Sequence, residues 1–363
     1  MIFGELCMPA LSCCLIAKNE AHRLPNLLKS LSTICEQLVL VDTGSTDDTV
    51  EVAKNMGADV AMFPWNDSFS DARNRSLEMA EHPWIFYVDA DDSVPEKSLY
   101  HISELKQRSP EEAYGFVITS TQDGVTGMAS AQIRMFPNVK GNRFQYRVHE
   151  QIRPALIKQG TPIVFTDIKI VHTGYTDSNT LAAKQRRNLE LLEKDLADYP
   201  EDGFLRYLAG MACMDLERLT RARNEFQKAW ELSVADTDKG HIALGAALEL
   251  SEMALRKGGD RHANALLWLQ RAESLEGEYP RCLYLRGRIQ YEKQEFTNAL
   301  KSLRRLIEWE RPALFLPLDL TMLKTTAAAL MGQIYLKTGR PQEAVSIFDR
   351  ARHLLSKASS DRS

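Results

Sequence analysis

The apolar segment Trp84–Val88 runs straight into the acidic tetrad Asp89-Ala90-Asp91-Asp92, and this join constrains the fold more than any other stretch. Five consecutive apolar residues, three of them aromatic, predict a short strand buried on both faces. In an extended chain Asp89 and Asp91 project from the same face. Paired hard oxygen ligands at a strand end suit Mg²⁺ or Mn²⁺ carrying a phosphate. The alternative is an Asp-rich turn that binds no ion.

Strand-like and helix-like segments alternate before this point. Leu11–Ala17, Gln37–Val41 and Asp59–Phe63 read as strands. Leucines at helical spacing in Leu24–Thr33 predict a first helix, and a second helix ends at Gly57. This alternation predicts an α/β fold with a mostly parallel sheet and right-handed crossovers. In such sheets ligands bind outside the carboxyl ends of the strands.

Polar residues gather at that edge of the predicted sheet. Asn19-Glu20 follows the first strand and Asp42 follows the second. A further helix begins near Ser70, which we expect to cap it, and its N-terminus can meet an anion. Arg73 or Arg75 can add a charge-assisted contact. Acids after three strands, together with an arginine-bearing helix start, predict a site for a nucleoside diphosphate and a metal ion.

Four motifs in this order resemble the family-2 glycosyltransferases, in the branch that carries tetratricopeptide (TPR) repeats after the catalytic domain. They are Ala17-Lys18-Asn19-Glu20, Val41-Asp42-Thr43-Gly44-Ser45-Thr46-Asp47, Phe69-Ser70-Asp71-Ala72-Arg73-Asn74 and Asp89-Ala90-Asp91-Asp92. The resemblance implies a GT-A fold, a nucleoside-diphosphate sugar donor with uridine favoured, and Mn²⁺ or Mg²⁺ held by the DXD motif.

The resemblance also implies roles for single residues. It places Asp42 near the nucleobase, Asp89 toward the ribose and the metal, and Asp91 on the metal. The rest of the donor nucleotide pocket would include Ala17, Asn19, Glu20, Asp71, Arg73 and Ala90.

Two histidine-bearing segments follow the strand-like Ala113–Thr121 and Ser130–Phe136, which the turn residues Gly124 and Gly127 predict to form a hairpin. In Arg147–Ile152, read as extended, His149 and Gln151 share one face and Glu150 takes the other. The second segment, His172-Thr173-Gly174-Tyr175, ends the strand-like Val164–Val171. A hydrogen-bonded structural histidine is the alternative in both, but both segments also resemble the TPR-bearing branch.

Glycosyl transfer with inversion needs a base for the acceptor proton and a cation for the leaving diphosphate. The sequence lacks a clear Glu-Asp pair for the base, and it lacks the QxxRW motif of processive synthases. We therefore take Glu150 as the candidate base, with His149 as the second choice. His172 would complete the metal shell or contact the diphosphate.

The second half of the chain predicts helical repeats. Four trios share the offsets 0, +4 and +7: Ala222, Phe226 and Ala229; Ala265, Leu269 and Ala272; Ala299, Leu303 and Leu306; Ala344, Phe348 and Ala351. Three of them follow a glycine at a fixed distance, namely Gly210, Gly287 and Gly332. This resembles the TPR pattern, in which small residues let paired helices approach and the pairs stack into a solenoid. A plain helical bundle is the alternative.

Length and composition set further bounds. A chain of 363 residues is long for one core, and we predict a GT-A domain over 1–178 and a repeat domain over 179–363. The net charge of −4 gives no reason to expect a nucleic acid partner. No apolar run approaches the ~20 residues that span a bilayer, and the first ten residues lack a basic signal-peptide region. Six cysteines without a CxxC pair favour reduced thiols and a cytoplasmic location.

These observations predict a metal-dependent, inverting, non-processive glycosyltransferase of the hexosyltransferase type. The acceptor would be a protein or peptide bound with help from the repeats, which could also form a homodimer. A cell-envelope glycan or a lipid-linked saccharide is the alternative acceptor. A scaffold with an inactive transferase domain and a nucleotidyltransferase are the rival classes; the intact acids argue against the first, and the absence of a Gly-rich loop after the first strand argues against the second.

Overall fold

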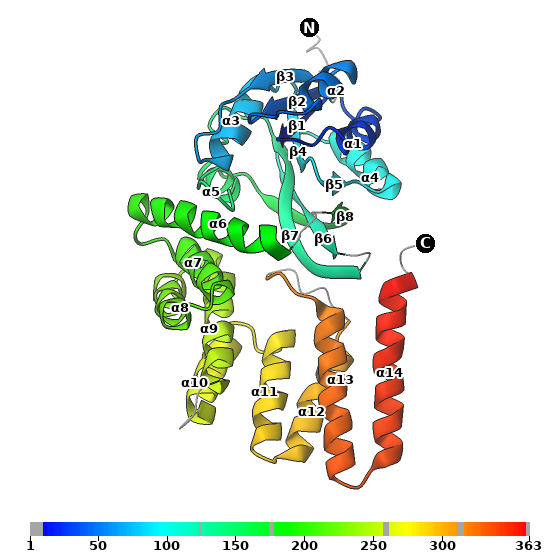
Figure 1. The fold of residues 1–363 in the computed structure, drawn as a ribbon, viewed down its shortest axis with the longest axis vertical. Coiled ribbons are helices and arrows are strands. Elements are labelled where there is room, and N and C mark those ends of the chain that lie inside the picture. Colours follow the sequence, from blue (N-terminus) through cyan, green and yellow to red (C-terminus); the bar gives the residue numbers. More distant parts are fainter. Residues whose placement is uncertain (1–9, 123–124, 174–177, 257–260, 311–315, 361–363) are drawn as a thin grey trace, which may run out of the picture. The chain divides into compact units, whose positions relative to one another are not determined.

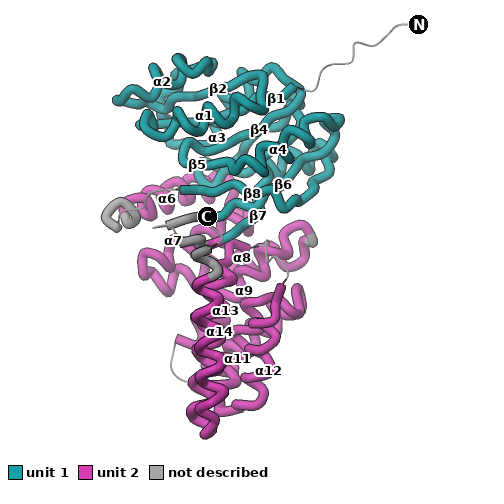
Figure 2. Tube along the Cα trace, turned by 90° about the vertical axis from the view of Figure 1, so that its right-hand side faces the viewer, with its two compact units in different colours: residues 1–122, 129–176 teal, residues 123–128, 177–363 magenta. Residues whose placement is uncertain are grey.

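The structure is a computed structural model and describes residues 10–122, 125–173, 178–256, 261–310 and 316–360. The chain divides into two compact units, which Figure 2 shows in separate colours. Unit 1 comprises Met1–Gln122 and Ala129–Thr176, and unit 2 comprises Asp123–Met128 and Asp177–Ser363. Gly124 of the predicted hairpin turn and Gly174-Tyr175 of the second histidine segment lie outside the described residues.

A single sheet organises unit 1 (Figure 1). Its described strands lie in the order β3-β2-β1-β4-β7-β6-β8-β5. Their bounds are β1 Leu11–Ala17, β2 Gln37–Asp42, β3 Asp59–Met62, β4 Trp84–Asp89, β5 Asp92–Ser93, β6 Ala113–Gln122, β7 Val125–Pro137 and β8 Ile163–His172. The helices between them are α1 Leu24–Leu31, α2 Thr49–Asn55, α3 Phe69–Met79, α4 Glu96–Lys106 and α5 Arg153–Lys158.

The parallel sheet predicted from the first four strands is confirmed. β1 pairs in parallel with both β2 and β4, and β2 pairs in parallel with β3. The register sets Ala17 opposite Asp42 and Ile16 opposite Asp89, so the polar strand ends lie side by side. β7 then runs antiparallel to β4, with Met135 opposite Phe86. This reversal brings a strand from the later part of unit 1 against the acidic tetrad.

Both faces of the sheet are covered, as the apolar strands require. Alternate residues of β4 point to opposite sides: Phe86 packs in a core with α1 and α4, whereas Ile85 and Tyr87 pack in a second core with α3 and α5. Figure 1 shows α3 on one side of the sheet and α1 and α4 on the other. Because β4 is anchored on both faces, the acids that follow it have a fixed starting point.

Two local predictions are wrong. Ser68, and not Ser70, caps α3: Ser68 is extended and accepts from the Asp71 backbone N–H, whereas Ser70 is already helical. The segment around Glu150 is not extended either. It is a turn closed by the Gln145–Gln151 bridge, in which His149 has a φ of 55°, so strand alternation does not apply.

Unit 2 is built of helices in successive pairs (Figure 1). A long helix α6 precedes them, and each pair joins two neighbouring helices by a short connection. The bounds are α6 Ser178–Asp198, α7 Gly203–Asp215, α8 Leu219–Ser233, the 3₁₀ turn η1 Thr237–Lys239, α9 Gly240–Leu255, α10 Arg261–Leu275, α11 Pro280–Glu292, α12 Phe296–Ile307, α13 Leu320–Lys337 and α14 Pro341–Ser360. None of the helices described here has the length and apolar character needed to cross a membrane.

The glycines of the repeat pattern mark close helix contacts. A Cβ at Gly210 would lie 2.5 Å from the Phe226 ring, and one at Gly287 would lie 2.7 Å from the Leu303 side chain. Gly332 meets the Phe348 ring in the same way. Each partner is the middle residue of the corresponding trio. The three glycines therefore let the first helix of a pair approach the second.

We expect Gly210→Ala to lower the free energy of unfolding by about 1–3 kcal/mol, because the new methyl group would collide with the fully buried Phe226 ring. The better helix propensity of alanine opposes this by about 1 kcal/mol. Gly240→Ala is the matched control, since a Cβ there meets nothing within 4 Å. Urea unfolding of the full chain measures both variants, and equal midpoints would contradict the close contact.

Candidate functional site

The loops after β1 and β2 are joined to each other at the carboxyl edge of the sheet. Asn19, with a φ of 59°, accepts through Oδ1 from the Thr46 backbone N–H at 2.8 Å. Its own N–H donates to Ser45 Oγ at 2.9 Å, and the Glu20 N–H donates to Thr49 Oγ1 at 2.8 Å. These bonds hold the Asn19 and Asp42 loops as one rigid rim.

Asp42 lies at the base of this rim and is fully buried. Its Oδ2 accepts from the backbone N–H groups of Gly44 and Ser45 at 2.9 and 3.0 Å. Gly44 has a φ of +103°, a conformation that favours glycine. Among the described residues, nothing donates to the buried Oδ1 of Asp42. A buried carboxylate oxygen is normally hydrogen-bonded, so this atom is suited to accept from a ligand.

Three other predicted pocket residues have contacts of their own. The Ala17 carbonyl accepts from the Thr43 N–H at 2.9 Å, which ties β1 to the loop after β2. The Glu20 carboxylate pairs with Arg23 at 2.7 Å. Asp71 is exposed on the first turn of α3 and accepts from Asn66 Nδ2 at 2.7 Å. Of these three, Ala17 lies directly beside the Asp42 loop.

A cluster of possible metal ligands follows β4. One ligand atom from each of Asp89, Asp91, Asp92 and His172 lies within 4.8 Å of the others. The sheet assembles it: Asp92 in β5 pairs with His172 in β8, and the Asp89 N–H donates to Asp92 Oδ2 at 2.8 Å. His172 Nδ1 lies 2.9 Å from Asp92 Oδ1 and 3.4 Å from Asp91 Oδ1. Ala90 is buried in the intervening turn.

Two buried arginines form ion pairs with the acids of this site. Arg73 of α3 donates to Asp89 Oδ1 through Nη2 and to Glu150 Oε1 through Nε. Arg134 of β7, 1% exposed, donates to Asp89 Oδ2 at 3.0 Å and lies 3.2 Å from Asp92 Oδ2. The Tyr87 ring lies 4.8 Å from the Arg73 guanidinium and 4.7 Å from that of Arg134. Cation–π contact with a shared ring stabilises these neighbouring like charges.

The carboxylates differ in their environment. Burial alone would raise the pKa of Asp89, but Arg73 and Arg134 outweigh it and hold that pKa far below its usual value. Burial raises the pKa of Asp91, and the negative Asp89 and Asp92 add to the effect although His172 opposes it. Asp91 makes no ion pair with either arginine and its side chain is 25% exposed. It is therefore the acid most available to a cation.

His172 complements these acids. The hydrogen bond with Asp92 raises the pKa of His172, against the opposing effect of burial, and Asp91 raises it further. When Nδ1 of a neutral imidazole donates to a carboxylate, its Nε2 lone pair is left to bind a metal. Asp92 is thus placed to orient His172.

The charges of the whole cluster do not balance. Among the described ion pairs, the carboxylates of Asp89, Asp91, Asp92 and Glu150 meet the guanidiniums of Arg73 and Arg134, so two negative charges remain when His172 is neutral. One divalent cation would neutralise this excess. Carboxylate and imidazole ligands suit Mn²⁺, and carboxylates suit Mg²⁺.

The structure places most of the predicted site residues in two adjacent groups. Ala17, Asn19, Glu20 and Asp42 form the rim, whereas Arg73, Asp89, Ala90, Asp91, Glu150 and His172 form or adjoin the acidic cluster. Asp71 and His149 are exposed.

Sequence reasoning gave no role to Arg134 or Asp92. The signal for Arg134 is an arginine inside the apolar run Ile133–Phe136, where burial requires a charged partner.

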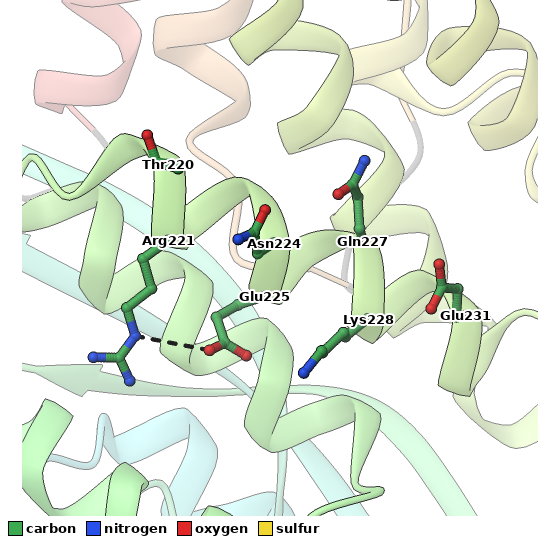
Figure 3. Close-up of a pocket in the computed structure, with 7 residues that line it drawn as sticks. All are labelled: Thr220, Arg221, Asn224, Glu225, Gln227, Lys228 and Glu231. Carbon is green, nitrogen blue, oxygen red and sulfur yellow. Dashed lines mark ion pairs between the residues drawn. The ribbon is translucent and has the colours of Figure 1, made fainter.

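Unit 2 has a hollow of its own, of about 620 Å³, over one polar face of α8 (Figure 3). Its lining residues are Thr220, Arg221, Asn224, Glu225, Gln227, Lys228 and Glu231. The acids and bases among them are equal in number, and Arg221 pairs with Glu225 at 3.7 Å. Neither a metal-ligand cluster nor an excess charge marks this face, so we assign it no chemistry.

Known proteins resemble this chain in both units. Glycosyl transferase family 2 matches residues 12–176, and the tetratricopeptide repeat matches residues 280–312 and 326–351. The SPbeta prophage-derived glycosyltransferase SunS of Bacillus subtilis (strain 168) is 28% identical over 308 residues, covering 83% of this chain and 71% of SunS. A TPR repeat-containing protein of Synechococcus elongatus is 34% identical over 214 residues, covering 56% of this chain and 52% of that protein.

A solved structure is also similar in part. Glucosyl-3-phosphoglycerate synthase from Mycobacterium tuberculosis aligns with a TM-score of 0.38 and 16% identity, covering 51% of this chain and 79% of the synthase.

The family matches agree with the architecture. The mostly parallel sheet of unit 1 with its acidic strand ends confirms the predicted GT-A fold, and the glycine-spaced helix pairs confirm the TPR-like solenoid. Residues 12–176 match glycosyl transferase family 2, and we conclude that the chain is a glycosyltransferase with C-terminal tetratricopeptide repeats.

Proposed function

We propose that this glycosyltransferase takes its sugar from a nucleoside-diphosphate sugar, with uridine as the favoured base, and uses Mn²⁺ or Mg²⁺. The observation that carries the proposal is the pairing of two features at one sheet edge. Asp42 offers a buried acceptor oxygen to which no described residue donates. The carboxylates of Asp89, Asp91, Asp92 and Glu150 outnumber the guanidiniums of Arg73 and Arg134 by two when His172 is neutral. A nucleobase N–H suits the first, and a cation with a diphosphate suits the second.

Asp91 and His172 are the ligands we assign to the cation, since neither is held by an arginine. Asp89 faces the same cluster, but both of its carboxylate oxygens accept from arginines, so it contributes chiefly negative charge. When bound, a divalent cation supplies a Lewis acid that stabilises the charge on the leaving diphosphate.

Glu150 is the group we propose to accept the acceptor's proton, which makes the transfer inverting. Its carboxylate is largely buried next to Arg73, which also contacts Asp89. Arg73 therefore orients the base relative to the donor side of the site. His149, in the same turn, remains the second choice for this role.

The acceptor we propose is a protein or peptide, and its support is the repeat unit. TPR-type helix pairs stack into extended surfaces that bind polypeptide segments. Helices α7 to α14 follow one another in pairs, and the tetratricopeptide repeat matches residues 280–312 and 326–351 among them. A homodimer through these helices remains part of the proposal.

A panel of nucleotide sugars tests the proposal. The full chain is incubated with UDP-, GDP-, ADP- and CDP-sugars, with Mn²⁺, with Mg²⁺ or with EDTA, and release of the nucleoside diphosphate is measured. We expect slow hydrolysis of one UDP-sugar that EDTA abolishes. Release that EDTA does not change would contradict the role of the cation, and absence of binding to every nucleotide sugar would favour a non-catalytic scaffold.

The Asp42→Asn variant tests the base-binding role. The amide can still accept from Gly44 and Ser45 through one oxygen, but it turns the free acceptor into a donor. We expect UDP affinity to fall by roughly 10- to 100-fold, since a hydrogen bond to a charged group is worth about 1.5–3 kcal/mol. Calorimetric titration with UDP measures this, and an unchanged affinity would remove Asp42 from the base site.

A further inference from the structure

Arg134 is the buried group of the cluster that neither the motifs nor the proposed reaction uses. It reaches the acids from β7, the strand antiparallel to β4, and its guanidinium joins Asp89 Oδ2 to Asp92 Oδ2. Burying an arginine at 1% exposure is unfavourable unless its charge is matched, and here two carboxylates match it. The burial of the Arg134 guanidinium between two carboxylates implies that its positive charge has a function.

Arg134 and its neighbours contact every carboxylate oxygen of Asp89 and Asp92. Arg73 takes one oxygen of Asp89 and Arg134 takes the other. In Asp92, Oδ1 lies against His172, while Oδ2 accepts from the Asp89 N–H and lies against Arg134. Both carboxylates are thus fully engaged, and Asp91 is the acid left over.

We propose that Arg134 is a positioning residue that limits how strongly the acidic cluster binds its cation. Because Arg134 pairs with the carboxylates of Asp89 and Asp92, coordination positions on the cation would remain available to the diphosphate oxygens of the donor. Without Arg134, the same carboxylates would bind the cation directly and draw it deeper into the cluster. This inference rests on the proposed cation-dependent function and adds a residue to it.

Removing the charge of Arg134 should strengthen Mn²⁺ binding, whereas damage to the fold would weaken it. Arg134→Met removes one positive charge in nearly the same volume, so Mn²⁺ should bind on the order of tenfold more tightly. Turnover of the donor should nevertheless fall at least about tenfold, because fewer cation positions remain for the diphosphate. A residue that merely braces the fold would, on removal, weaken both.

The test uses the full chain without nucleotide, with Mn²⁺ affinity read from the electron paramagnetic resonance signal of free Mn²⁺. Arg134→Lys keeps the charge but has no fork to hold two carboxylates, so we expect an Mn²⁺ affinity within about threefold of wild type with a reduced kcat. Arg281→Met is the matched control, since Arg281 is also an arginine paired with two acids, Glu249 and Glu252, but it lies in unit 2 with its side chain 17% exposed. It should leave Mn²⁺ affinity unchanged.

The outcomes separate the two proposals. Weaker or unchanged Mn²⁺ binding in a folded Arg134→Met variant overturns the positioning role while leaving the cation site in place. If the methionine variant does not fold, Arg134→Gln repeats the measurement with a polar side chain. If neither variant folds, the Mn²⁺ affinity of Arg134→Lys is the test, and a large loss of that affinity overturns the positioning role. Failure of the wild-type chain to bind Mn²⁺ at all defeats the proposed function itself.

Discussion

Replacing Asp91 with asparagine should abolish cation-dependent turnover of the donor. Among the described residues, Asp91 is the acid of the cluster that pairs with no arginine, so its charge is the one most available to the cation. The amide keeps the shape and removes that charge. We expect kcat/KM for donor hydrolysis to fall on the order of a thousandfold, equivalent to about 4 kcal/mol in the barrier.

The matched control is Asp167→Asn, which makes the same chemical change on an exposed position of β8. Release of the nucleoside diphosphate and Mn²⁺ binding are measured for both variants. Asp91→Asn should lose both, and the control should retain both. If Asp91→Asn retained Mn²⁺ binding and turnover, the cation would have to lie elsewhere.

Glu150→Gln should stop the chemistry while leaving the donor bound. A positioned base contributes about 10²- to 10⁴-fold, so we expect hydrolysis and sugar transfer to fall within that range. Binding of UDP with Mn²⁺ should remain within about threefold of wild type, because Glu150 contacts Arg73 and is not one of the four residues whose possible ligand atoms lie together. Titration with UDP and a single-turnover assay measure the two effects separately.

His149→Gln is the companion variant, since His149 is the neighbouring second candidate on the same turn. A loss of turnover in His149→Gln combined with normal turnover in Glu150→Gln would transfer the role of base to the histidine. A loss of donor binding in Glu150→Gln would instead show that the carboxylate acts by holding Arg73.

The parts of the fold that could be predicted are those in which hydrophobic or small residues recur at a regular spacing. Alternating strands and helices define the parallel half of the sheet, since each strand buries both faces. The trios after Gly210, Gly287 and Gly332 define helix pairs, because only a glycine admits the facing ring or leucine side chain. Local hydrophobic spacing carries this information by itself.

The contacts that hold the site could not be predicted in the same way. Arg134 meets Asp89 because β7 reverses direction beside β4, and no local pattern encodes that pairing. The side on which Glu150 lies could not be predicted, because residues 145–151 form a turn. The positive φ of His149 interrupts a segment whose sequence resembles an alternating strand. Local sequence patterns encode neither the pairing of distant strands nor an unusual φ value at a single residue.

The two-residue strand β5 has a consequence for what the acidic motif means. β5 carries Asp92, and its pairing with β8 is what brings His172 to the cluster. A fragment that stopped before residue 172 would keep every letter of the motif and still lack a possible ligand and the partner of Asp92. Occupancy of this site by a metal ion would therefore report that β5 has paired with β8.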